Sequence, residues 1–239
     1  MTSADRPAVV GLLAPMPSEM QPLAKALSLQ RAKGDQLYKG AVGATALVAA
    51  RTGIGTSRAA EATARLLDAV HVEHVMVVGI AGGLGSSAVG DVLFPEVVVD
   101  KTTGMEYRSS PLGGVIPRDK LMTHDDFDMT PEEQQQLVAD GFVAVDMETA
   151  AVASVCEQRG CAWSAIRAVS DLVGVTPGDV ITLANADGSP NLGAAVRYLV
   201  TKPWRIPRLV RLGLDSRAAA QGAARAAARV LATGPSTRS

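Results

Sequence analysis

Three acidic residues stand where short apolar runs give way to helix-like sequence, and their positions suggest acid–base chemistry. Glu19 follows the apolar run at 9–14, Glu148 follows the run at 141–145, and Asp171 follows the run at 162–170. Acids just past the carboxyl ends of buried strands line the crevice in which open α/β sheets bind ligands. Any one of them would also be explained as a helix N-terminal carboxylate favoured by the helix dipole, so only the set of three indicates a site.

Two glycine-rich runs follow apolar segments and would let a ligand touch the backbone. The run RTGIG at 51–55 precedes a helical pattern and could cradle an anion, and the run GIAGG at 79–83 ends a strand-like segment. Neither matches the dinucleotide fingerprint or the phosphate-binding loop of nucleotide hydrolases. Tight turns in a compact sheet explain either run taken alone.

The elements that would hold these residues alternate between strands and helices. Apolar runs predict strands at 8–14, 37–42, 45–50, 74–79, 91–99 and 162–169. Helical spacing predicts helices at 17–27, 57–70 (capped by Ser57), 131–139, 148–159, 190–200 and 208–231, and 101–120 reads as a loop. The alternation predicts an α/β fold with a twisted mixed sheet flanked by helices, in one domain over 1–232 with a disordered tail at 233–239.

Length and composition exclude several classes of protein. A chain of 239 residues, of which 47% are hydrophobic, can bury a large core. The net charge of −1 argues against a general nucleic-acid binder. Cys156 and Cys161 are too few for a disulfide framework and are expected to be small core residues. No apolar run reaches membrane-spanning length, so we expect a cytoplasmic protein.

Taken together, five runs resemble the nucleoside phosphorylase/nucleosidase superfamily, and most closely its 5′-methylthioadenosine/S-adenosylhomocysteine nucleosidases. The runs are GLLAPMPSEM at 11–20, TGIG at 52–55, VGIAGG at 78–83 with VGD at 89–91, VDMETA at 145–150, and IRAVSD at 166–171. The resemblance implies that superfamily's fold, cleavage of the N-glycosidic bond of a 5′-modified adenosine without metal or organic cofactor, a homodimer, and a place in nucleoside catabolism and methionine salvage.

The resemblance also implies roles for single residues. Asp171 would protonate N7 of the leaving purine, with Ser170 as its hydrogen-bonding neighbour. Glu148 would bind the ribose hydroxyls, and Glu19 would orient the attacking water. Met147 would form an apolar floor under the sugar, and Met16 would lie near the 5′ substituent. Ala81 and Gly82 would contact the nucleoside through their backbone. Phe127 would stack on the purine, and a backbone group at Asp128 would contact the edge of the base.

The chemistry of N-ribosidic cleavage requires such a set of acids. In the transition state the sugar gains positive charge and the base gains negative charge, which nearby carboxylates and a proton donor relieve. Water that attacks the opposite face of the sugar needs a general base, as in inverting glycoside hydrolysis. Asp171 must then hold a proton, a state that burial at an apolar strand end would favour.

The chain departs from the family in two places. The segment between Asp100 and Leu121 is too short for the helix that family members carry there. The resemblance therefore does not predict which 5′ substituent the pocket accepts or how the subunits meet. Phosphorylases place an arginine just before their glycine strand end, whereas this chain has MVVGI at 76–80. Hydrolysis is therefore favoured. A phosphate-dependent phosphorylase, with Arg51 as a weak substitute for the missing arginine, is the alternative.

The C-terminal third is rich in arginine, and Asp215 is its single acid from 197 to 239. The run KPWRIPRLVRL at 202–212 is similar to the tail of hopanoid-associated phosphorylase-like members, which act on adenosylated lipids. A basic, partly apolar helix could lie on an anionic membrane surface, although a solvated basic face is the simpler explanation. An adenosylated-lipid nucleosidase or phosphorylase and a non-catalytic nucleoside-binding module are further alternatives.

Four other polar residues are expected to lie at the surface or to have a structural role. His71 and His74 are predicted at the surface, and His124 in a solvated loop. Arg167 interrupts an apolar strand, so a buried ion pair is expected for it.

Overall fold

The computed structural model of the chain describes residues 9–31, 34, 36–110, 112–126, 129–174 and 206–233. Ten strands form one mixed sheet: β1 Val9–Ala14, β2 Tyr38–Val42, β3 Thr45–Arg51, β4 His74–Gly83, β5 Val92–Leu93, β6 Pro95–Asp100, β7 Glu106–Arg108, β8 Asp119–Thr123, β9 Ala144–Asp146 and β10 Ala162–Leu172. The described helices are α1 Pro17–Ala26, α2 Thr56–Ala69, α3 Pro131–Ala139, α4 Thr149–Gln158 and α6 Ile206–Ala232. The predicted fold class is confirmed, and the helix predicted at 190–200 lies outside the described residues.

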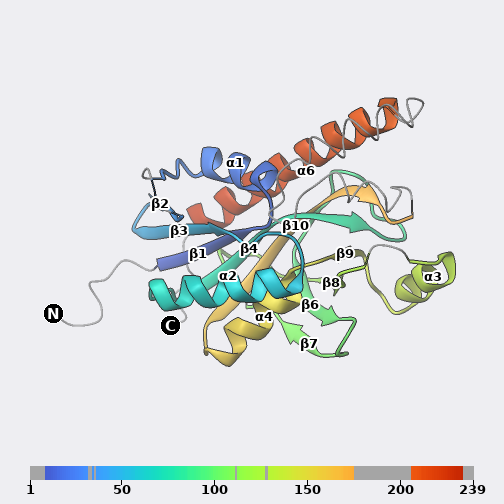
Figure 1. Cartoon of the computed structure of the whole chain (residues 1–239), viewed down its shortest axis with the longest axis horizontal. Coiled ribbons are helices and arrows are strands. Elements are labelled where there is room, and N and C mark those ends of the chain that lie inside the picture. The colour runs from blue at the N-terminus through green and yellow to red at the C-terminus, as the bar shows by residue number, and fades with distance from the viewer. Residues whose placement is uncertain are drawn as a thin grey trace.

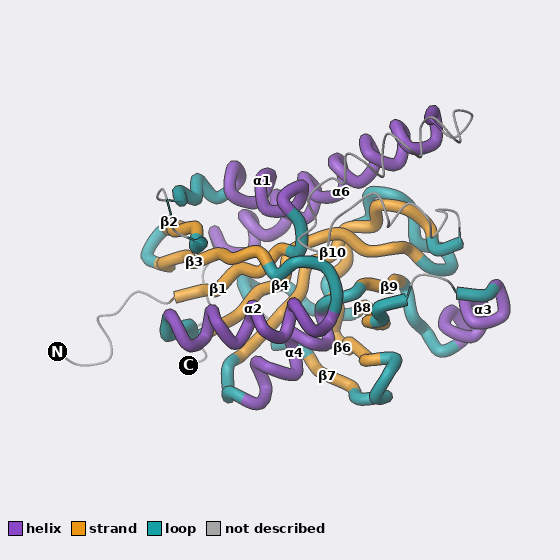
Figure 2. The backbone as a smooth tube through the Cα atoms, viewed as in Figure 1, coloured by secondary structure: helices purple, strands orange, loops and turns teal. Residues whose placement is uncertain are grey.

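Helices cover both faces of the sheet (Figure 1). α1 and α6 pack on one face, and α2 and α4 pack on the other, as the tube in Figure 2 also shows. Successive strand residues point to opposite faces, so Leu12 and Met76 join the core under α1 and α6, whereas Leu13 and Val77 join the core under α2 and α4. Burial on both faces explains why these strands read as continuous apolar runs.

β4 is the strand on which the candidate site is built. One of its edges pairs with parallel β10 along its whole length. The other edge pairs with parallel β1 as far as Val77, and with antiparallel β9 from Gly82 onward. The register therefore leaves an opening along 78–81, between the end of β1 and the end of β9. The segments that follow β1 and β9 meet at this opening.

Three predicted strand boundaries were wrong because pairing, which periodicity does not report, extends or divides the strands. The run GIAGG at 79–83 completes β4 instead of forming a turn, since both β10 and β9 pair with it. The single strand predicted at 91–99 divides at Phe94, whose N–H donates to Asp119 at 2.7 Å. The predicted loop at 101–120 contains β7 and the start of β8, which pair with the two edges of β6.

The start of α2 also differs from the prediction. Gly55, with a φ of 96°, precedes the helix, and Ser57 lies inside its first turn. Asp125 takes the capping role instead: it accepts the N–H of Thr56 at 2.8 Å and the Thr56 hydroxyl at 2.6 Å. The cap therefore comes from a distant segment, which local sequence patterns do not predict.

The end of the chain is more ordered than predicted at one residue. The hydroxyl of Thr233 donates to the carbonyl of Gly113 at 2.7 Å and ties the end of α6 to the 112–117 loop. Residues 234–239 of the predicted tail lie outside the described residues. Within the described parts of the chain, no helix is long and apolar enough to cross a membrane.

Candidate active site

A buried cluster of charges fills the opening beside β4. Arg167 of β10 is fully buried, and its guanidinium pairs with Asp146 and, at 3.3 Å, with Glu148. It also donates to the hydroxyl of Thr149 at 2.9 Å and to the carbonyl of Ile80 at 3.4 Å. The ion pair expected for Arg167 is thus confirmed, and it joins β10 to the opening.

Glu19, in the first turn of α1, lies on the same opening. Its Oε1 accepts the N–H of Ile80 at 2.9 Å, and its Oε2 accepts the N–H of Met16 at 2.8 Å. A Cβ at Gly79 would displace the ends of the Glu19 and Arg167 side chains, so glycine leaves them room to meet there. Burial raises the pKa of Glu19 to about 7, although Arg167 and the two N–H bonds oppose the shift. Such a carboxylate exchanges its proton near neutral pH, as a general base must.

Glu148 precedes α4 and is buried in the same cluster. Its Oε1 accepts the N–H of Gly55 at 3.2 Å, and its Oε2 faces Arg167. Burial raises its pKa to about 8, because Arg167 offsets only part of the desolvation and the nearby Asp146 and Glu19 add like charge. The fold thus brings together two of the three acids identified from the sequence.

Asp146 is a member of the cluster that the sequence reasoning missed. It accepts the hydroxyl of Thr123 at 2.6 Å and the N–H of Thr149 at 3.2 Å, besides its ion pair with Arg167. These bonds fix the carboxylate, which in turn orients the guanidinium. The signal was available: a buried arginine needs a carboxylate, and Asp146 stands two residues before Glu148.

Asp171 lies across β4 from this cluster, near the end of β10. A register shift between Val169 and Asp171 places Asp171 beside Gly82 of β4, and such bulges re-aim side chains. The buried Ser170 donates its hydroxyl to Asp171 Oδ1 at 2.6 Å, in agreement with the pairing implied for them. Asp171 itself is half-buried rather than buried, because the sheet ends one residue later.

The other predicted contact residues surround these groups, as far as they are described. Ala81 and Gly82 are buried in β4, and the Ser170 hydroxyl also reaches the carbonyl of Ala81 at 3.4 Å. Met16 and Met147 are half-buried in the two segments that meet at the opening. Phe127 and Asp128 lie outside the described residues, so the stacking ring and the base-edge contact stay predictions.

The glycine-rich turn at 51–55 does not present a free anion cradle. The N–H of Gly55 binds Glu148, and the N–H of Thr56 binds Asp125. Arg51 is exposed and lines a separate depression between α2 and the β2–β3 hairpin. Backbone donors that would suit a phosphate are therefore bound to carboxylates of the protein itself.

A hollow of about 480 Å³ is lined in part by Leu172 and Val173, the two residues that follow Asp171. Its walls come from the ends of β4 and β10 and from α3, the helix that follows the Phe127 segment: Gly83, Leu84, Gly85, Leu172, Val173, Pro131, Gln134, Gln135 and Val138. Mostly apolar walls with a few polar groups are typical of small-molecule sites. In the described ranges there is no group of three or more His, Cys, Asp or Glu side chains placed to hold a metal ion.

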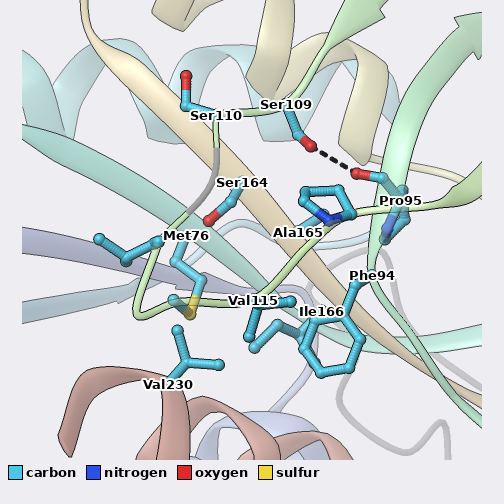
Figure 3. Close-up of a pocket in the computed structure, with 12 residues that line it drawn as sticks. Met76, Phe94, Pro95, Ser109, Ser110, Val115, Ser164, Ala165, Ile166 and Val230 are labelled. Atoms are coloured by element: carbon cyan, nitrogen blue, oxygen red, sulfur yellow. Dashed lines mark hydrogen bonds between the residues drawn. The ribbon is translucent and has the colours of Figure 1, made fainter. Parts of the chain in front are cut away.

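A second, much smaller cavity of about 20 Å³ lies on the α6 face of the sheet (Figure 3). Met76, Ile166 and Val230 line it, together with the loop that α6 holds through Thr233. Ile166 faces this cavity, so by strand alternation Arg167 faces the other side of the sheet. The cavity is therefore separate from the charged cluster and belongs to the packing of α6.

His74 is buried, and its predicted surface position was wrong. Its Nε2 lies 2.8 Å from the hydroxyl of Ser164 on β10, and burial lowers the pKa of His74 to about 4. The ring is therefore neutral at physiological pH. It lies at the start of β4, at the opposite end of the strand from the cluster, and has a structural role.

Comparison with known proteins places the chain in a family. It matches the sequence profile of the phosphorylase superfamily over residues 9–124 and 121–200. A 5′-methylthioadenosine/S-adenosylhomocysteine nucleosidase from Geobacillus kaustophilus is 32% identical over 176 residues, which cover 61% of this chain and 75% of that protein. This relationship bears out the enzyme class expected from the sequence, a nucleosidase.

Solved structures share the fold at lower identity. The 5′-methylthioadenosine/S-adenosylhomocysteine nucleosidase of Neisseria meningitidis, in complex with methylthio-immucillin-A, has a TM-score of 0.69 and 20% identity, covering 94% of this chain and 99% of that one. Futalosine hydrolase of Helicobacter pylori has a TM-score of 0.68 and 20% identity, covering 94% and 97%. Profile, relative and fold agree: the chain belongs to the phosphorylase superfamily.

Proposed function

We propose that this protein is a purine nucleoside N-ribosyl hydrolase that cleaves the N-glycosidic bond of a 5′-modified adenosine with water as the nucleophile. The observation that carries the proposal is Glu19, which is buried beside Arg167 with its pKa raised to about 7. A carboxylate with this pKa can take a proton from water near neutral pH. Asp171, across β4, supplies the second carboxyl group that inverting hydrolysis requires.

The two sides of β4 divide the proposed reaction between them. Asp171 protonates N7 of the purine while Ser170 holds its carboxyl group in place. Glu148 binds the ribose hydroxyls, and its ionised form stabilises the positive charge that grows on the sugar. Glu19 accepts a proton from the water that attacks the opposite face. Nucleoside contacts then come from Met147 under the sugar, Met16 at the 5′ side, and the backbone of Ala81 and Gly82.

The charge of the cluster supports water over phosphate as the nucleophile. Glu19, Asp146 and Glu148 surround the single guanidinium of Arg167. A phosphate dianion entering this opening would find one guanidinium among three carboxyl groups, so its binding would require Glu19 and Glu148 to stay protonated, whereas a water molecule makes no such demand. Two N–H groups at the start of α2, where phosphate could bind, already bind carboxylates: Gly55 binds Glu148 and Thr56 binds Asp125.

The purine and its 5′ substituent are suggested by the hollow beside Asp171 and by the relatives. The hollow is lined by Leu172, which follows the proposed proton donor in sequence, and its volume of about 480 Å³ has room for a purine ring. The Geobacillus kaustophilus relative is named for thioether-substituted adenosines, which favours a small 5′-thioether substrate. An adenosylated lipid is the alternative substrate, because the exposed residues of α6 suit a lipid surface.

A nucleoside panel with and without phosphate tests the proposal. We expect free adenine and a ribose product from 5′-methylthioadenosine or S-adenosylhomocysteine in phosphate-free buffer, with futalosine and adenosine as comparison substrates. Turnover that needs phosphate and accumulates a ribose 1-phosphate product would overturn the hydrolase assignment. Glu19→Gln should slow the chemical step while nucleoside affinity, measured by calorimetry, stays in place. Glu61→Gln, an exposed acid of α2, is the matched control and should behave like the parent.

A further inference from the structure

α6 has two halves with different surroundings. From Ala219 to Leu231, seven residues of one face are buried against the sheet and α1: Ala219, Ala220, Ala223, Ala224, Ala227, Val230 and Leu231. In the first half of the helix, Val210 is 56% exposed and Leu214 is 62% exposed. These two apolar side chains lie four residues apart and so share one face of the helix. That face points away from the protein core.

The same outward face carries positive charge. Arg211, Arg217, Arg225 and Arg229 are all exposed, and Asp215 is the single acid in the α6 sequence. Asp215 lies 3.7 Å from Arg211, in an i,i+4 pair whose arginine side chain remains 86% exposed. At helical spacing these arginines flank Val210 and Leu214 along the outward side of the helix. The outward face is therefore cationic along the helix and apolar in its first half.

The first turns of α6 lie toward the end of the sheet that carries Asp171. Figure 1 shows the first turns of α6 extending past the sheet on the side toward which the arrow of β10 points. Asp171 lies near that end of β10. The first turns of α6 therefore lie toward the end of β10 that carries Asp171, while the outward face of the helix points away from the sheet.

We propose that the outward face of α6, defined by Val210, Leu214, Arg211, Arg217, Arg225 and Arg229, docks the enzyme on the surface of an anionic phospholipid bilayer. Arginines attract the lipid phosphates, and the two apolar side chains enter the boundary between headgroups and acyl chains. The helix would lie on the membrane without crossing it.

Other occupants fit this face less well. A second copy of the chain would bring an identical row of arginines against the first, and like charges repel. A nucleic acid would satisfy the arginines but would leave Val210 and Leu214 facing a phosphate backbone. An anionic bilayer matches both features at once, so the charge and the exposed apolar area favour it. This inference does not depend on the proposed reaction.

Vesicle co-sedimentation of the full chain tests the proposal. We expect binding to vesicles of equimolar phosphatidylcholine and phosphatidylglycerol, little binding to phosphatidylcholine alone, and weaker binding as salt is raised. The double variant Arg217→Glu/Arg225→Glu should lower the partition coefficient by at least about tenfold. Val210→Ser/Leu214→Ser should lower it several-fold in the same assay. The replaced side chains are exposed, so thermal unfolding should stay close to that of the parent.

A matched control keeps the test specific to α6. Arg58→Glu/Arg65→Glu makes the same charge change on exposed positions of α2 and should leave vesicle binding unchanged. Three results would overturn the proposal: equal binding to neutral vesicles or none to anionic ones, equal loss in the α2 control, or self-association in the ultracentrifuge that the α6 charge variant abolishes. Binding to a DNA duplex as tight as to anionic vesicles would also overturn it, in favour of a nucleic-acid surface.

Discussion

The two edges of β4 present carboxyl groups in opposite environments. At the opening, Glu19 and Glu148 are buried around Arg167, and desolvation raises the pKa of both. At the β10 edge, Asp171 is half-buried and held by a hydrogen bond from Ser170. Burial and like charge therefore tune the groups at the opening, whereas the bulge at Ser170 mainly aims Asp171. A substrate that covers Asp171 would complete its surroundings.

The largest expected effect is a loss of activity on substitution of Asp171, at the β10 edge of β4. Asp171→Asn keeps the size of the side chain but removes the acid proton, so we expect kcat to fall by about 10²–10⁴. The fold should stay intact because Asp171 is half-exposed. Steady-state release of adenine and thermal unfolding of the same preparation check both points. Near-normal turnover in a folded Asn variant would remove Asp171 from the mechanism.

Substitution of Arg167 in the opening should lower the stability of the fold. Arg167→Met leaves Asp146, Glu148 and Glu19 without their buried counter-charge, and we expect the free energy of unfolding to fall by about 3–5 kcal/mol. The control is Arg159→Met, which breaks an exposed pair with Asp68 and should cost less than about 1 kcal/mol. Urea denaturation of both variants at one pH gives the comparison. Equal losses would mean that the cluster is not held by Arg167.

Within the opening, substitutions of Glu148 and Glu19 should affect the sugar preference of the enzyme differently. Glu148→Gln should weaken a charge-assisted bond to a ribose hydroxyl, which is worth about 1.5–3 kcal/mol. Its kcat/KM should then discriminate less between ribo- and 2′-deoxyribonucleosides than the parent enzyme does. Glu19→Gln should keep the parent's sugar preference. If Glu19→Gln loses the preference and Glu148→Gln keeps it, the two roles are reversed.

The pH dependence should show the smallest and most specific effect. Glu19 must be ionised to act as a base, so kcat/KM should rise roughly tenfold per pH unit as pH approaches about 7 from below. Stability should change in the opposite direction. The folded state holds this proton more tightly than the unfolded chain does, so the free energy of unfolding should fall as pH rises from 4.5 to about 7. A Glu19→Gln variant that keeps the full slope of kcat/KM would assign it to another group, whereas part of the stability slope should remain because the pKa of Glu148 is also raised.

Much of the fold was predictable because strands and helices each impose a characteristic periodicity of apolar residues on the sequence. The predicted positions of β1, β2, β3, α1 and α3 agree with the structure to within about a turn. Features that depend on pairing were not predictable. The GIAGG run became strand, and the loop at 101–120 gained β7, because a neighbouring strand supplied the hydrogen bonds.

The candidate site was predictable in part, for a related reason. The resemblance pointed to Glu19, Glu148 and Asp171 from the residues beside them, and the fold places all three along β4. It did not point to Asp146, whose partners Thr123 and Arg167 come from other strands. His74 was misplaced for the same reason: the strand that buries it and offers Ser164 lies far away in sequence.

The sequence by itself determined the α/β class, the position of the acids after apolar strands and the run of arginines in α6, because these follow from local periodicity and residue type. Tertiary structure alone decided which acids share an opening, since that depends on where β1 and β9 stop pairing with β4. It also decided their protonation, because desolvation depends on every neighbour at once. Finally, it decided which face of α6 the sheet covers and which face it leaves exposed.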